Sequence, residues 1–99
     1  MSLLLSVNVP FVDSDADEAS VDGTGGTIAA LFTNLDFTIC RQILIYNAGA
    51  ANILYGKNSA GAKFPIPPGS SLTLALKDLA KGFLKAASGT QTVDVLAIY

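Results

Sequence analysis

The side chains that most enzymes use for acid–base or nucleophilic chemistry are scarce in this chain. Its 99 residues include no His, no Trp, one Cys and one Glu. Catalysis by His, metal clusters of His or Cys, and Ser-His-Asp or Cys-His arrangements are therefore excluded. Cys40 lies in an apolar stretch without a partner for an internal disulfide, and the sequence predicts a small buried side chain there. We expect no enzymatic activity and no cofactor.

One acidic motif has the spacing of a cation site. Asp13, Asp15 and Asp17 are spaced like the first ligands of a calcium loop, in which alternate carboxylates converge on one ion. Glu18, however, stands where such a loop requires Gly, and Thr24 stands where it requires a bidentate Glu. The favoured interpretation is a solvated acidic loop, and a cation site is the alternative.

A glycine-rich run and a set of aromatic residues have similarly open interpretations. Residues 23–27 are glycine-rich like a phosphate-binding loop, but no Gly-Lys-Ser/Thr sequence follows, so the run predicts a flexible turn. Aromatic side chains that could stack on a sugar are found in or beside predicted strands. They are Tyr46, Tyr55, Tyr99, Phe64 and Phe83. Core packing is the favoured interpretation of these residues, and a sugar-binding platform is the alternative.

The charges are distributed unevenly along the chain. The formal net charge is −2, but residues 1–40 contain six acids and no base, whereas residues 41–99 contain all six bases and two acids. The favoured interpretation of this polarity, from −6 to +4, is a solvated acidic loop and a solubilising lysine rim, and the alternative is that complementary potential orients copies of the chain or a partner. Because the bases are scattered, we expect no binding to nucleic acid.

The chain has no apolar run of the ~20 residues that a membrane helix needs, so we expect no membrane partner. The N-terminus lacks the basic start of a secretion signal, and Asn8 and Pro10 interrupt its short apolar stretch. We therefore expect a mature intracellular product that carries no address signal.

The remaining pattern predicts an all-β fold. Seven or eight short strands, separated by Gly, Pro and Asn turns at intervals of about ten residues, are typical of a small antiparallel β-sandwich or barrel. The clearest strand covers residues 39–46, with both faces largely apolar and therefore buried or nearly so, and it forms a hairpin with residues 53–56. Residues 92–99 form the final strand. At most one short helical turn is predicted, near residues 77–81.

We expect a single domain over residues 1–99. Residues 1–12 form an N-terminal arm or an edge strand, residues 13–26 an acidic glycine-rich loop, and residues 27–99 the β-sandwich body. As an arm, the first segment adds its apolar stripe to the sheet edge of another chain. The candidate interface residues are that stripe, Leu3, Leu5, Val7, Val9 and Phe11, together with a basic edge formed by Lys77, Lys81 and Lys85.

Residues 39–99 also carry a series of turn motifs between apolar strands. The series runs from Arg41-Gln42-Ile43-Leu44-Ile45-Tyr46 through Asn47-Ala48-Gly49, Ile53-Leu54-Tyr55-Gly56, Ile66-Pro67-Pro68-Gly69 and Ala87-Ser88-Gly89-Thr90 to Val93-Asp94-Val95-Leu96. This order resembles small structural proteins of tailed bacteriophages, most of all capsid decoration (cement) proteins. The first 38 residues do not share in the resemblance.

The resemblance implies a non-enzymatic virion protein that binds the outer surface of a phage capsid and stabilises it. Its partners are then the major capsid protein and further copies of itself, as a trimer. Two alternatives remain: a tail, collar or fibre component of the virion, and a carbohydrate-binding β-sandwich module.

Overall fold

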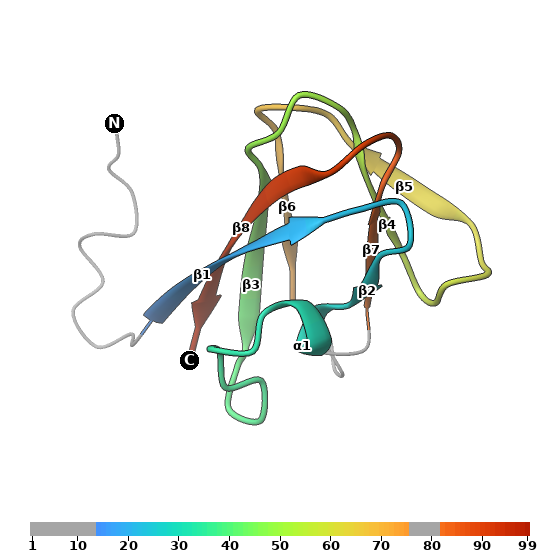
Figure 1. Ribbon diagram of the computed structural model, residues 1–99. Coiled ribbons are helices and arrows are strands. Elements are labelled where there is room, and N and C mark those ends of the chain that lie inside the picture. The colour runs from blue at the N-terminus through green and yellow to red at the C-terminus, as the bar shows by residue number, and fades with distance from the viewer. Residues whose placement is uncertain (1–13, 76–81) are drawn as a thin grey trace.

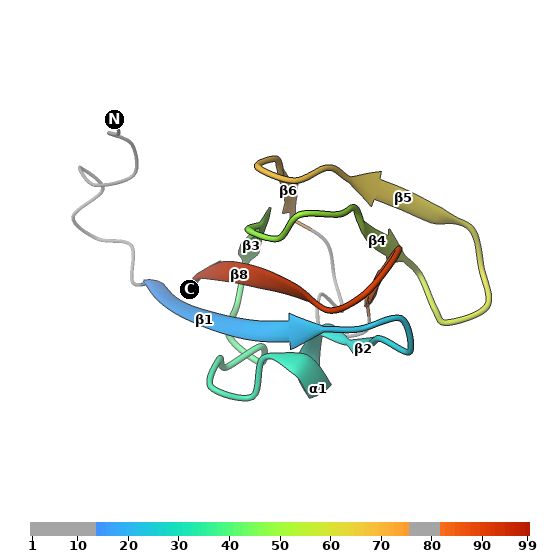
Figure 2. The same ribbon diagram turned by 45° about the horizontal axis from the view of Figure 1, so that its top comes forward.

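The computed structural model describes residues 14–75 and 82–99, which form two antiparallel four-stranded sheets and one short helix (Figures 1 and 2). The first sheet has the order β1 (Ser14–Val21), β8 (Gln91–Ile98), β3 (Gln42–Asn47), β6 (Ser71–Leu74). The second sheet has the order β2 (Gly26–Thr27), β7 (Phe83–Ala86), β4 (Ile53–Gly56), β5 (Lys63–Ile66). The predicted all-β sandwich of seven to eight strands is confirmed.

Consecutive strands almost always lie in different sheets. β4 and β5 form a hairpin within the second sheet, and every other consecutive pair is divided between the two sheets. The predicted hairpin of residues 39–46 with residues 53–56 is therefore wrong. β3 pairs with β6 and β8, whereas β4 pairs with β5 and β7, so residues 48–52 cross from one sheet to the other.

The buried side chain of Asn47 explains this crossing. Its Nδ2 donates hydrogen bonds of 2.8 Å to the carbonyls of Ala51 and Ile66, and its Oδ1 accepts a bond of 2.9 Å from the N–H of Gly49. Asn47 is 0% exposed, its bond to Ile66 is buried, and its bonds to Ala51 and Gly49 are partly buried. The amide therefore links the end of β3, the crossing loop and the end of β5. A tight hairpin turn joins only two adjacent strands and needs no such link.

Gln91 connects the same crossing loop to a second one. Its Oε1 accepts hydrogen bonds from the N–H groups of Ala50 and Ala51, at 2.7 and 3.3 Å, and its Nε2 donates to the carbonyl of Ser88 at 2.9 Å. Ser88 belongs to the connection that leads from β7 in the second sheet back to β8 in the first. Two polar side chains thus hold three of the sheet crossings together at one end of the sandwich.

The acidic segment is a strand for most of its length, so the predicted loop over residues 13–26 is wrong. β1 pairs with β8 from Ser14 to Val21, and its side chains alternate between an inner face with buried Val21 and an exposed outer face. Acids are compatible with this strand because the outer face and the edge are open to water. The turn is confined to residues 22–25, where Asp22 Oδ1 accepts bonds from two backbone N–H groups and Gly25 has φ of 71°.

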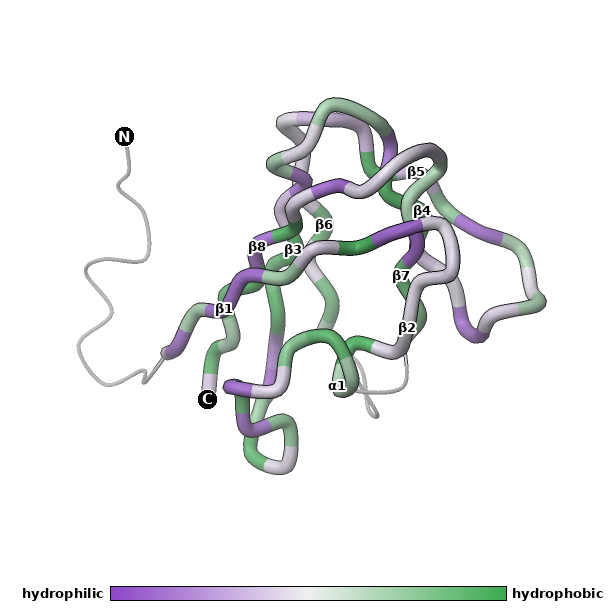
Figure 3. The backbone as a smooth tube through the Cα atoms, in the orientation of Figure 1, coloured by the Kyte–Doolittle hydropathy of each residue, from purple (hydrophilic) through white to green (hydrophobic). Residues whose placement is uncertain are grey.

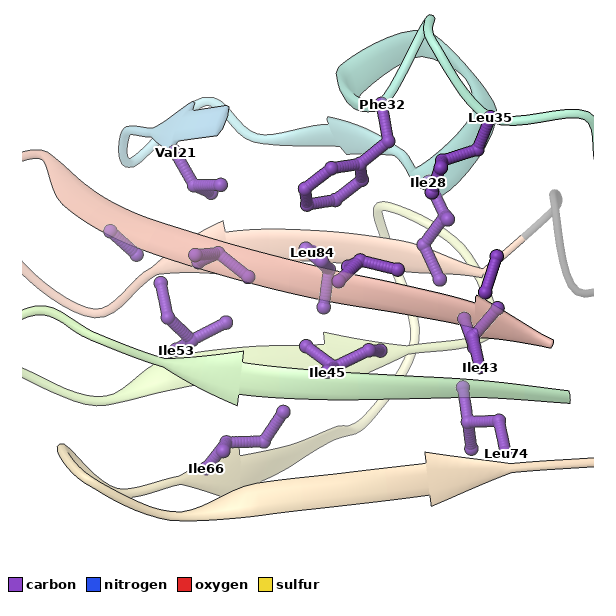
Figure 4. Packing of buried hydrophobic residues seen from close by; sticks show 14 residues of the cluster. Val21, Ile28, Phe32, Leu35, Ile43, Ile45, Ile53, Ile66, Leu74 and Leu84 are labelled. Carbon is purple, nitrogen blue, oxygen red and sulfur yellow. The ribbon is translucent and has the colours of Figure 1, made fainter. Parts of the chain in front are cut away.

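The core lies between the inner faces of the two sheets (Figure 4). Alternate residues of the strands supply it, so that every second position of β3 and β8 is buried. Its fully buried members include Ile43, Ile45, Ile53, Ile66, Leu84, Val93 and Val95. The other face of β3 is only partly covered, with Tyr46 40% exposed, so the prediction that both faces of this strand are buried is wrong.

The helix α1 (Ile28–Leu31) closes the sandwich between β2 and β3. Thr27 caps it by accepting a hydrogen bond of 3.2 Å from the N–H of Ala30, and Ile28 and Phe32 extend into the core at 0% exposure. This helical turn was not expected from the sequence. The turn predicted near residues 77–81 lies outside the described residues.

Replacing Asn47 by Ala should destabilise the fold strongly. Each buried carbonyl left without a donor costs about 1–3 kcal/mol, so we expect the free energy of unfolding to fall by roughly 3 kcal/mol in denaturant titrations. Asn58→Ala is the matched control, because Asn58 Oδ1 also accepts bonds from two backbone N–H groups, those of Ala60 and Gly61, but in an exposed loop. Equal losses for the two variants would contradict the role assigned to Asn47.

Candidate functional site

Most of the predicted interface residues lie outside the part of the chain that the structure describes. This applies to the stripe Leu3, Leu5, Val7, Val9 and Phe11 and to Lys77 and Lys81. Lys85 is described: it lies on β7, half-buried, on the outer face of the second sheet. Asp15, Asp17 and Glu18 belong to the edge strand β1, which is labelled in Figure 1.

The outer face of the first sheet combines apolar and acidic side chains. The register places Leu44 of β3 beside Leu96 of β8, and Tyr46 beside Asp94. On the other side of β8, Ala16 and Glu18 of β1 lie opposite Leu96 and Asp94. We call this surface the acidic face; it consists of Ala16, Glu18, Leu44, Tyr46, Asp94, Leu96 and Ile98.

The apolar residues of the acidic face do not serve the core. Leu44, Leu96 and Ile98 belong neither to the buried cluster nor to the partly buried residues that pack against it. In Figure 3 the hydrophobic colour recurs along β3, and the hydrophilic colour along β1. A sheet face on which apolar side chains stay partly exposed without packing against the core is suited to binding another molecule.

Two carboxylates on the acidic face lie directly opposite each other without compensation. Glu18 and Asp94 are register partners on adjacent strands, and like charges in such positions destabilise a sheet. Among the described residues, neither carboxylate has an ion pair. A base from another molecule would therefore find two acceptors beside an apolar row.

The outer face of the second sheet carries the opposite charge. The register places Leu54 of β4 between Pro65 of β5 and Lys85 of β7, and in the next row it places Gly56 between Lys63 and Phe83. We call this surface the basic face; it consists of Leu54, Lys63, Pro65, Phe83 and Lys85. Leu54 and Phe83 are half-buried and, like the leucines of the acidic face, lie outside the core cluster.

Lys63 and Lys85 differ in how they are held. The Nζ of Lys63 lies 5.8 Å from the centroid of the Phe83 ring and donates hydrogen bonds to the carbonyls of Ser59 and Gly61. Lys85 has no such partner within the described residues. Lys85 is therefore the base of this face that is available to a carboxylate of another molecule.

Asp17 lies on the inner side of β1 and holds a neighbouring turn. Its carboxylate accepts hydrogen bonds from the side-chain and backbone N–H groups of Asn34, at 3.2 and 3.3 Å, and from the N–H of Glu18 at 2.8 Å. Partial burial raises the pKa of Asp17, but these hydrogen bonds outweigh that effect, so its pKa lies below the ordinary value. The hydrogen bonds that Asp36 accepts from Thr38 lower the pKa of Asp36 similarly.

The structure does not assemble the other motifs noted in the sequence. Within residues 14–75 and 82–99, no three His, Cys, Asp or Glu residues are grouped to hold a metal ion, and no helix could span a membrane. Tyr46 and Phe83 lie on opposite outer faces, Tyr55 and Tyr99 pack against the core, and Phe64, 58% exposed, is the register partner of Tyr55 on β5. These five aromatic residues therefore form no single platform. Cys40 is partly buried, and its Sγ donates to the carbonyl of Gln42 at 3.2 Å.

Comparison of the chain with protein-family models, curated proteins and solved structures finds no match. The two outer faces are therefore the candidate site on their geometry alone. Sequence reasoning missed them because it assigned the second apolar set of residues 39–46 to a buried face. The available signal was that the inner positions of residues 43–46 and 93–98 are all apolar, whereas their outer positions mix Leu, Ile, Tyr and Asp.

Truncation of two neighbouring residues of β3 should lower the stability by very different amounts. Ile45 is 0% exposed in the core, so Ile45→Ala should cost about 2–5 kcal/mol of unfolding free energy. Leu44→Ala on the acidic face should cost less than about 1 kcal/mol, because Leu44 leaves no closed cavity. Chemical denaturation of both variants measures the difference, and an equal loss would mean that Leu44 belongs to the core.

Asp17 should make the stability depend on acid pH. Because its pKa is lower in the folded than in the unfolded chain, its contribution is present above the ordinary carboxyl pKa, about 4, and is lost as the pH falls through the folded value. Asp17→Asn and Asn34→Ala should therefore both flatten the decline in melting temperature below about pH 5. An unchanged decline in both variants would contradict this role.

Proposed function

We propose that this protein is a non-enzymatic structural component of a virion, which binds the outer surface of a phage capsid and stabilises the shell as a decoration protein. The observation that carries the proposal is the pair of outer sheet faces, on which rows of apolar side chains lie outside the core. Such faces on a small sandwich suit a subunit that completes its burial in an assembly. The turn pattern of residues 39–99, which resembles capsid decoration proteins, adds the kind of assembly.

The proposed partners are the major capsid protein and further copies of the chain, which form a trimer in the proteins that it resembles. The protein is made in the host cytoplasm and joins the capsid surface. Stabilisation then works by mass action: a subunit that binds only the assembled shell favours that state by its differential affinity, about 2.7 kcal/mol per site at a free concentration one hundred times the Kd.

The first test is the copy number of this chain relative to the major capsid protein in purified particles, measured by quantitative mass spectrometry. A ratio near one supports decoration of the shell. A ratio of a few per hundred would instead assign the chain to the tail, collar or fibre, and absence from particles would overturn a virion role. The dispersed aromatic residues give the carbohydrate-binding alternative no support from the geometry.

The apolar stripe at the N-terminus, Leu3, Leu5, Val7, Val9 and Phe11, is proposed as an arm that adds to the sheet edge of the coat protein. Deleting residues 2–12 should then lower the occupancy of the protein on particles at least about tenfold, a loss of about 1.4 kcal/mol per site. Co-sedimentation of the shortened chain with particles lacking it measures this. Full occupancy would show that the sandwich body alone carries the binding.

A further inference from the structure

We infer that the acidic face of one molecule binds the basic face of a second copy, so that the chain associates head to tail. The two faces lie on opposite sides of one sandwich, since they are the outer surfaces of its two sheets (Figure 2). They therefore cannot pair within a molecule. Each face requires a partner from another molecule, and the carboxylates of the acidic face complement the lysines of the basic face.

The local pattern around one charge on each face is the same. Asp94 has Tyr46 as its cross-strand neighbour and Leu96 two residues along its own strand. Lys85 has Leu54 as its cross-strand neighbour and Phe83 two residues along its own strand. Cross-strand neighbours and same-face neighbours have similar spacings in all antiparallel sheets. When the apolar neighbours of Asp94 in one copy contact those of Lys85 in the next, the carboxylate and the ammonium group therefore lie close together.

The electrostatics of the acidic face favour a basic occupant. The opposed carboxylates of Glu18 and Asp94 repel each other, and within the described residues no base offsets them. A lysine placed between them relieves this repulsion and forms a charge-assisted bond beside a desolvated apolar row. Of the described bases, Lys85 has the matching apolar neighbours and no internal partner.

A contact between two different faces has a definite consequence for assembly. Each molecule in a pair keeps one unused face, so association continues until a ring closes, or it produces an open chain. An isologous dimer, in which the same face meets itself, would instead bring Glu18 and Asp94 of both copies together. The charges of the acidic face disfavour that arrangement.

The test is a charge exchange measured by sedimentation velocity over a range of protein concentrations at low salt. Asp94→Lys and Lys85→Glu should each weaken self-association at least about tenfold, because each places like charges in the contact. The double variant should recover to within about threefold of the original protein, because the lysine introduced at position 94 of one copy then meets the glutamate introduced at position 85 of the next. Asp15→Lys and Lys57→Glu are matched controls, with the same charge changes at exposed positions outside both faces.

Each outcome decides the inference. Recovery in the double variant supports it. A double variant that remains as weak as the singles, or an original protein that stays monomeric at all concentrations, overturns it, as does self-association that is lost only when residues 1–13 are deleted. If circular dichroism shows that a charge-reversal variant does not fold, Asp94→Asn and Lys85→Gln replace the reversals. The inference then requires that the double variant lose less free energy of self-association than the sum of the losses in the two single variants.

This inference does not rest on the proposed function. Self-association is measured on the protein alone, whereas the virion role is measured by occupancy on particles. Association that follows the charge exchange, together with absence from particles, would leave the inference standing and remove the function. Particles that carry the protein, together with a protein that stays monomeric in solution, would support the function and overturn the inference.

Discussion

The buried amide of Asn47 is the interaction on which the architecture of this sandwich depends. At the point where β3 ends, its three hydrogen bonds hold the chain as it crosses to the second sheet and join that crossing to the end of β5. Gln91 extends the connection to the β7–β8 crossing. A buried polar group is stable only when all its partners are in place, so the Asn47 amide favours one set of crossings over alternative strand pairings.

The crossings explain why a short chain can build two sheets with one core. Because nearly every connection changes sheet, strands that are neighbours in sequence face each other across the interior. The inner side of each sheet is consequently filled by residues from the whole chain, from Val21 to Ala97. The helix α1 then closes the open side with Ile28 and Phe32, which the strands alone would leave uncovered.

The same arrangement separates the charges of the chain in space. One acid of β1, Glu18, and one acid of β8, Asp94, lie on the outer face of the first sheet, and Lys63 of β5 and Lys85 of β7 lie on the outer face of the second. The two opposite outer surfaces thus carry charges of opposite sign, and the acidic surface combines residues from both ends of the sequence. Both surfaces also expose apolar rows outside the core, which makes them suited to contact with other molecules rather than only with water.

The sequence by itself determined the all-β class and the approximate positions of most strands, because alternation and turn residues are local properties. Its composition, which includes no His, excluded His-based chemistry. It did not determine which strands pair. Residues 47–52 have the composition of a hairpin turn, and only the carbonyl of Ile66, distant in sequence, makes Asn47 the centre of a crossing. Likewise, the acids of β1 suggest a loop until the backbone of β8 provides hydrogen-bond partners along their whole length. The two outer faces also depend on tertiary structure, because the register decides which apolar residues of a strand meet the core and which remain outside.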